Sequence, residues 1–173
     1  MNVTLDQGQQ AVARLLAQLR HQNNRANGVP DRKVGQQPPD YTDLNGIGGE
    51  LAFCILANVC PDMSISPRSG SYDCLLNGYR VDVKTTRYVR TPMLCVYIGK
   101  RLSDADIYVL MVGEMPVYRC AGWTWADELL RRENIRDLGY GPTYVLPSAA
   151  LHPWEELEDV KNAAPMSVHR AAL

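Results

Sequence analysis

Two aspartates lie opposite each other on the strands of a predicted β-hairpin and could together hold a metal ion. Residues 71–86 read SYDCLLNGYRVDVKTT, and Asn77-Gly78 within them is the dipeptide most typical of a two-residue hairpin loop. With that loop, Asp73 lies directly opposite Asp82 on the same face, at a Cβ separation of about 4.5–5.5 Å, where like charges repel. Such a pair is tolerated when one carboxylate is protonated, when a cation neutralises the pair, or when both bind a metal ion.

Lys84 supplies a candidate cation beside these acids. It follows Asp82 by two residues, so it lies on the same face of the strand, and the same register places it opposite Ser71. The hairpin alone leaves two interpretations open, a solvated polar face with a local ion pair and a metal site. Because opposed like charges are unfavourable, the register also predicts that Asp82→Asn leaves the metal-free protein at least as stable as wild type.

A third carboxylate comes from a predicted helix upstream of the hairpin. Glu50 closes the stretch DLNGIGGE, whose three glycines are costly in a helix and make sense where another backbone or a ligand approaches closely. Glu50 also shares a helical stripe with Phe53, Cys54 and Ala57, and an acid among apolar neighbours needs a partner. Three carboxylates and an ammonium in one place suit a hard divalent cation such as Mg²⁺ or Mn²⁺.

These residues resemble the signature of the PD-(D/E)XK nucleases, the restriction-endonuclease-like superfamily. That signature is a helix glutamate, an acid on one strand, and acid-x-lysine on the next, here Glu50, Asp73 and Asp82-Val83-Lys84. The order of the flanking elements is similar, and the resemblance covers residues 46–130. One departure is Tyr72, which stands where the motif often has proline.

The resemblance implies a fold, a cofactor and an activity. Asp73, Asp82 and the Val83 carbonyl would hold Mg²⁺ (or Mn²⁺), Glu50 would complete the coordination or hold a second ion, and Lys84 would orient the attacking water or stabilise the transition state. The implied activity is that of an endonuclease or exonuclease on DNA, in recombination, repair, restriction or phage DNA processing. A nuclease acting on RNA, and a catalytically silent nucleic-acid-binding or assembly protein that kept the fold, remain alternatives.

Several polar and basic residues near the predicted site could line a path for phosphates. These candidates are Thr86, Arg87, Arg90, Lys100 and Arg101. Ordinary surface solubility explains each of the basic ones equally well. Arg80 lies near the hairpin turn and is left outside the site, and the arginines of 131–136 fit a solvated face.

Composition restricts the possible classes of protein. The chain has 173 residues, of which 46% are hydrophobic, which fits one domain with a sizeable core. A net charge of −1 provides no overall electrostatic attraction for nucleic acid, so binding must rest on a local basic surface. No long apolar run or signal peptide is evident, and the five cysteines fit reduced thiols, so we expect a cytoplasmic protein without a membrane anchor. A homodimer, or docking on a larger complex, is left open.

The periodicity of apolar residues predicts an α/β or α+β domain with a mixed central sheet flanked by helices, similar to a restriction-endonuclease core. The pattern favours helices over 5–20, 43–59, 124–133 and 153–162. It favours strands in the hairpin and over 93–98, 106–112, 117–121 and 144–146. The polar segment 21–40 is predicted as a long loop and 163–173 as a flexible tail.

Overall fold

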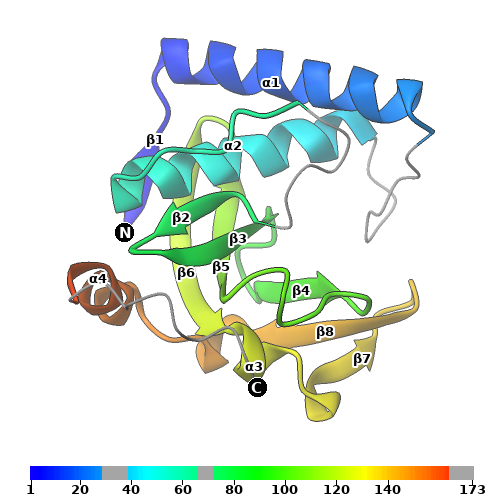
Figure 1. The fold of residues 1–173 in the computed structure, drawn as a ribbon, viewed down its shortest axis with the longest axis vertical. Coiled ribbons are helices and arrows are strands. Elements are labelled where there is room, and N and C mark those ends of the chain that lie inside the picture. Colours follow the sequence, from blue (N-terminus) through cyan, green and yellow to red (C-terminus); the bar gives the residue numbers. More distant parts are fainter. Residues whose placement is uncertain (29–38, 66–71, 164–173) are drawn as a thin grey trace.

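A five-stranded mixed sheet forms the centre of the molecule in the computed structural model, which describes residues 1–28, 39–65 and 72–163. The strand order is β1-β6-β5-β3-β2 (Figure 1). The strands are β1 (Asn2–Thr4), β2 (Cys74–Leu76), β3 (Tyr79–Thr86), β5 (Ile107–Glu114) and β6 (Val117–Trp125). Strands β3 and β5 are parallel and the other neighbours are antiparallel, which confirms the predicted mixed α+β class.

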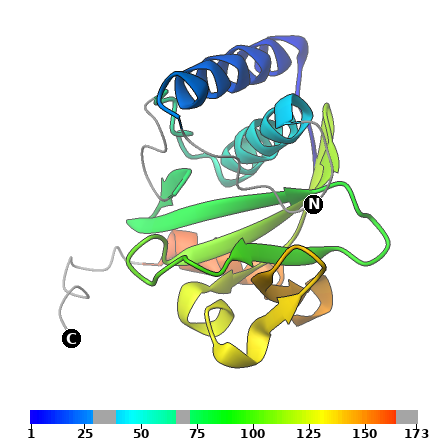
Figure 2. The ribbon, with the colours of Figure 1, turned by 90° about the vertical axis from the view of Figure 1, so that its right-hand side faces the viewer.

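Helices cover one face of this sheet. Helix α2 (Pro39–Ala57) lies directly on the sheet, and α1 (Gln7–Ala26) lies over α2 on the side away from the sheet (Figure 2). Helix α4 (Trp154–Asn162) joins the same core, where Trp154 meets Phe53 edge to face at a ring separation of 6.3 Å. Val81 and Val83 of β3 point into this core, so their alternate neighbours face the other way.

A second, smaller sheet covers the opposite face. It is antiparallel in the order β4-β8-β7, with β4 (Met93–Tyr97), β7 (Ile135–Asp137) and β8 (Pro142–Pro147). Together with α3 (Ala126–Leu129) it buries Tyr108, Leu110 and Val112 of β5. Strand β5 is therefore covered on both faces, as its continuous apolar run predicted. The strand predicted over 93–98 exists as β4, but it belongs to this second sheet.

The predicted loop over residues 21–40 is wrong at both ends. Helix α1 continues to Ala26 and α2 begins at Pro39, while residues 29–38 lie outside the described part of the chain. The polar end of α1 is held by side-chain bonds to the segment after α2. Arg20 donates to the Ser64 carbonyl at 3.0 Å, and Asn23 donates to the Ile65 carbonyl. These long-range bonds stabilise a helix end that has no apolar stripe of its own.

The predicted helix over 124–133 is also shorter than expected. Only Ala126–Leu129 is α-helical, and the 3₁₀ turn Arg132–Asn134 follows. The Asn134 side chain donates to the carbonyls of Glu128 and Leu129 at 2.8 and 3.0 Å, so it takes up the last helical acceptors and ends the helix. The structure adds two short strands that the sequence pattern did not predict, β1 and β7. Of the predicted tail, only residue 163 is described.

Two glycines explain how closely α2 packs on the sheet. A Cβ on Gly48 would lie 2.2 Å from the Tyr118 hydroxyl oxygen, and one on Gly49 would lie 2.0 Å from Thr85 Oγ1. Gly46, by contrast, has no atom within 4 Å of the position its Cβ would take. Gly48 and Gly49 therefore let the helix approach β6 and β3, which brings the next residue, Glu50, beside the hairpin.

All five cysteines lie in the described residues, and none forms a disulfide bond. Cys54, Cys74 and Cys120 are buried, and Cys60 is exposed. Across residues 1–28, 39–65 and 72–163, no helix has both the length and the apolar character needed to cross a bilayer.

Candidate functional site

The hairpin that carries the predicted site has the expected loop. Asn77 and Gly78 have φ angles of 50° and 88°, the pair of positive values that defines a type I′ turn. The predicted register is confirmed along β2, where the pairs are Leu76 with Tyr79, Leu75 with Arg80 and Cys74 with Val81. Local turn chemistry thus sets the position of β3 relative to β2.

Asp73 lies one residue beyond this ladder and is held by backbone bonds. Its N–H donates to the Val81 carbonyl at 2.8 Å, and its carbonyl accepts the N–H of Asp62 at 2.8 Å. Its carboxylate accepts the N–H of Val83 at 2.7 Å. The side chain therefore takes the place of a strand partner for β3 where β2 ends, and the simple cross-strand pairing of Asp73 with Asp82 is not part of the observed ladder. Ser71, the predicted partner of Lys84, lies outside the described residues.

Asp82 is buried and binds two ammonium groups. Its side chain is only 3% exposed, on the face of β3 opposite to Val81 and Val83. Lys84 pairs with one carboxylate oxygen, and Lys100 donates to the other at 2.7 Å. The predicted ion pair between Asp82 and Lys84 is therefore present, and a second lysine joins it.

Glu50 is held by an arginine that the sequence analysis did not single out. Arg20 of α1 donates to the Glu50 carboxylate at 3.0 Å. The same guanidinium donates to the carbonyls of Ser64 and Asp62 at 3.0 and 2.6 Å. Because the backbone of Asp62 is bonded to that of Asp73, Arg20 links α1, α2 and the start of the hairpin in one network.

The acids and Lys84 influence one another's protonation. Burial, followed by the charges of Glu50 and Asp82, raises the pKa of Asp73 well above its usual range. Burial also raises the pKa of Glu50, against the opposing effect of Arg20. Burial would lower the pKa of Lys84, but the carboxylates of Asp82, Asp73 and Glu50 raise it instead. These shifts indicate a single electrostatic cluster rather than four separate surface groups.

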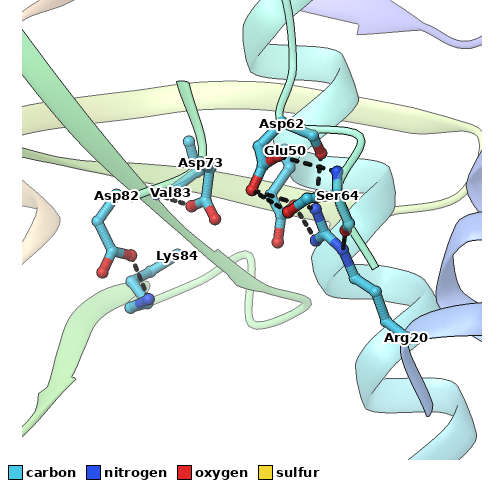
Figure 3. Close-up of polar contacts among 8 residues, drawn as sticks. All are labelled: Arg20, Glu50, Asp62, Ser64, Asp73, Asp82, Val83 and Lys84. Carbon is cyan, nitrogen blue, oxygen red and sulfur yellow. Dashed lines mark hydrogen bonds and ion pairs between the residues drawn. The ribbon is translucent and has the colours of Figure 1, made fainter. Parts of the chain in front are cut away.

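The carboxylates in this cluster do not all point the same way. In Figure 3 those of Glu50 and Asp73 point toward the same space, whereas that of Asp82 points toward Lys84. Within the described residues, no three His, Cys, Asp or Glu side chains are grouped closely enough to hold one ion. Two of these three acids are paired with cations, Glu50 with Arg20 and Asp82 with the two lysines, while Asp73 accepts the N–H of Val83.

A buried tyrosine completes the surroundings of Asp82. Tyr108 of β5 is the strand partner of Asp82 in the parallel ladder and is fully buried. Its hydroxyl has no hydrogen-bond partner in the described part of the chain, and burial raises its pKa.

Two residues of this region, Arg20 and Tyr108, were missed by the sequence analysis, although the sequence carries a signal for each. Arg20 continues the buried stripe of Ala13, Leu16 and Ala17, and Tyr108 is the one aromatic residue of the buried run DIYVLMV.

The predicted phosphate-binding residues divide into two groups. Arg87, Arg90 and Arg101 are exposed, the first two directly after β3 and the third in the connection between β4 and β5. Lys100 instead contacts Asp82, and Thr86 is half-buried at the end of β3. Arg80 pairs with Asp106 at 2.8 Å, so it stabilises the loop before β5. This contact agrees with the expectation that Arg80 lies outside the site.

A hollow of about 360 Å³ lies beside this cluster, along the outer edge of β2. It is lined by Cys60, Pro61, Asp62, Ser64, Tyr72, Cys74 and Leu75. The four residues of the nuclease-like signature are not in its lining, although Arg20 bonds to the carbonyls of Asp62 and Ser64, which are. The hollow therefore borders the cluster without containing it.

Comparisons of the chain with family models, curated proteins and solved structures gave no match.

Proposed function

We propose that this protein is a metal-dependent nuclease that hydrolyses phosphodiester bonds in DNA. The observation that carries the proposal is the cluster of Glu50, Asp73, Asp82 and Lys84, drawn from α2, the residue before β2, and β3. Three buried or half-buried acids and a lysine are costly to maintain in a core, and carboxyl groups whose pKa is raised, as those of Glu50 and Asp73 are, concentrate at functional sites.

The donor chemistry of this cluster fits Mg²⁺ or Mn²⁺. Carboxylate and carbonyl oxygens are the ligands these ions prefer. The residues that would hold the ion are Asp73, Asp82, Glu50 and Val83 through its carbonyl. The N–H of Val83 points at Asp73, and the carbonyl of a strand residue points to the same side as its N–H. A bound ion would lower the pKa of a water and neutralise charge on the phosphate.

Lys84 is suited to act beside that ion. Its side chain is about one-third exposed, at 34%, and its ammonium is paired with the buried Asp82, so it links the surface to the acid. The surrounding carboxylates raise its pKa and keep it protonated at neutral pH. A fixed positive charge at that position would orient the attacking water or stabilise the charge that develops on the phosphate. Arg87 and Arg90, exposed just beyond β3, would contact neighbouring phosphates.

A second candidate is a binding or assembly protein without catalytic activity. The observation that favours it is the balance of charge within the cluster, in which Glu50 and Asp82 are already paired with Arg20, Lys84 and Lys100. A site that satisfies its own acids has less need of a metal ion. This candidate predicts nucleic-acid or protein binding with no dependence on Mg²⁺.

The test is a cleavage assay on supercoiled plasmid, linear duplex, single-stranded DNA and RNA, with Mg²⁺, Mn²⁺ or EDTA. We expect cleavage of DNA that requires the metal and is lost in Asp73→Asn. Cleavage confined to RNA would change the substrate but keep the reaction. Absence of cleavage on all four substrates, together with absence of Mn²⁺ binding, would favour the silent protein.

A further inference from the structure

Both oxygens of the Asp82 carboxylate are bonded to lysine ammonium groups. Lys84 pairs with Oδ1, and Lys100 donates to Oδ2 at 2.7 Å. Because the Asp82 side chain is almost fully buried, water contributes little to its solvation. A divalent cation that binds Asp82 would therefore meet two ammonium charges at the same carboxylate and would compete with them for it.

The two lysines differ in how they are attached. Lys84 lies within β3, which pairs with β5 at this point through Leu110. Lys100 lies in the connection between β4 and β5, outside both sheets. Withdrawal of the Lys84 ammonium would leave it on the same face of the same strand, whereas the Lys100 side chain extends from a separate segment. Lys84 therefore stays beside Asp82 in any rotamer, whereas Lys100 is the ammonium that can move away from it.

The backbone that carries Lys100 is itself held in place. Its N–H donates to the Tyr97 carbonyl at 3.1 Å, and Asp104 donates to the Arg101 carbonyl at 3.0 Å. A Cβ on Gly99 would lie 2.4 Å from the Tyr97 ring, so this turn packs tightly against that side chain. Movement is thus expected in the Lys100 side chain, and substitution of that side chain should leave the turn in place.

We propose that Lys100 is a resident counter-ion of Asp82 that competes with the divalent cation for this carboxylate. The inference rests on the proposed metal-dependent function and concerns the regulation of the same site. In the metal-free protein the Lys100 ammonium occupies the place of the ion at Oδ2. Metal binding displaces that ammonium, which lowers the apparent affinity of the metal and leaves a cation at the edge of the site for a phosphate.

The experiment is a calorimetric titration of Mn²⁺ into the full chain without nucleic acid. Lys100→Met removes the competing charge while Lys84 still pairs with Asp82, so the protein should fold and bind Mn²⁺ about 5- to 150-fold more tightly, the range typical of coupled binding events. Lys100→Arg keeps the charge and should stay close to wild type. Arg101→Met, which removes a neighbouring exposed cation that does not contact Asp82, should leave Mn²⁺ affinity nearly unchanged.

Each result decides between the inference and the function on which it rests. Wild-type affinity in Lys100→Met, or an equal gain in Arg101→Met, would overturn the role of Lys100. Lys100→Gln serves as a second neutral variant if Lys100→Met does not fold, with the same expected direction. Tighter Mn²⁺ binding without cleavage of any substrate would keep the inference and reject the nuclease. Cleavage by wild type with unchanged affinity in the neutral variants would do the reverse, and absence of Mn²⁺ binding in all variants would reject both.

Discussion

The carboxylate of Asp73 accepts the backbone N–H of Val83 at 2.7 Å, so an acid side chain continues the hydrogen bonding of β3 just before β2 begins. This bond orients Asp73 without giving it a cationic hydrogen-bond partner among the contacts described. Asp82, the residue directly before Val83 in β3, is paired with two lysines instead. We therefore expect the two acids of the hairpin to have opposite effects on the stability of the metal-free protein.

Neutralising the two aspartates should have opposite effects on stability. Asp73→Asn keeps an oxygen that accepts the Val83 N–H and removes a carboxyl group whose pKa is raised by burial. In EDTA the melting temperature of this variant should therefore equal or exceed that of wild type. Asp82→Asn leaves two ammonium groups without their acid. We expect a loss of about 2 kcal/mol, below the 3–5 kcal/mol of a fully buried pair because both lysines retain some exposure.

Chemical denaturation of both variants in EDTA measures this difference. The structure thus reverses the sign that the hairpin register alone predicts for Asp82→Asn. Equal stability of the two variants would show that the lysine contacts of Asp82 contribute nothing to the fold.

The close approach of α2 to β3 predicts different effects for neighbouring glycines. Gly49→Ala places a methyl group against Thr85, and overpacking of this kind costs about 1–3 kcal/mol. Gly46→Ala meets no neighbouring atom and should stabilise the helix by up to about 1 kcal/mol. Thermal unfolding of the two variants beside wild type is the measurement. Similar shifts in both would mean that α2 does not pack on Thr85 as described.

Loss of Lys84 should separate binding from catalysis. Lys84→Ala keeps all three acids, so Mn²⁺ binding should persist, while DNA cleavage should fall by about 10²–10⁴-fold, the range of a positioned acid–base group. Lys84→Arg should not restore cleavage, because a planar guanidinium does not replace a compact ammonium. Mn²⁺ titration, DNA binding in Ca²⁺ and cleavage in Mg²⁺ are measured on the same sample. Cleavage near the wild-type rate would remove Lys84 from the mechanism.

Arg87 and Arg90 should affect DNA affinity through phosphate contacts. The double change to glutamine should weaken binding to all sequences similarly and reduce the slope of log K against log salt by about 1–2, since each phosphate contact contributes about 0.9. Arg131 and Arg132, which are also exposed but lie beyond α3, provide a control of equal charge. A slope reduced equally by both double variants would assign the effect to overall charge.

The stability of the contact between α3 and the segment before α4 should depend on pH. The Glu128 carboxylate, 2.8 Å from His152 Nε2, raises the pKa of His152, with a smaller opposing effect of burial and a further contribution from Glu156. A raised pKa means that the folded protein binds the proton more tightly. This stabilisation is fully present below the unfolded pKa of about 6.5 and is lost as pH rises through the folded value.

His152→Gln measures this contribution. At pH 5.5 the variant should be less stable than wild type by about 0.2–1 kcal/mol, a magnitude reduced by solvent because the imidazole is partly exposed. The difference between the two proteins should shrink as pH rises above the folded pKa. A difference that is constant between pH 5.5 and 9 would attribute the effect to packing of the ring on Trp123.

The sequence by itself determined the features that depend on local chemistry. The Asn77-Gly78 turn sets the register of β2 and β3 because only a few residues adopt the positive φ angles of a type I′ turn. The apolar run of β5 indicated a strand covered on both faces, and the glycines before Glu50 indicated a close approach of backbones. Acid-x-lysine spacing placed Asp82 and Lys84 on one face, where they pair.

Tertiary structure alone decided which charges meet. Arg20 and Glu50 are 30 residues apart, and Lys100 is 18 residues from Asp82, so no local pattern relates them. The assignment of β4 to a second sheet, and the extension of α1 to Ala26, likewise depend on contacts with distant segments. A turn or a strand is favoured by the dihedral preferences of its own residues. A buried carboxylate instead takes whichever cation the packed elements bring within reach, and this is known only once those elements are in place.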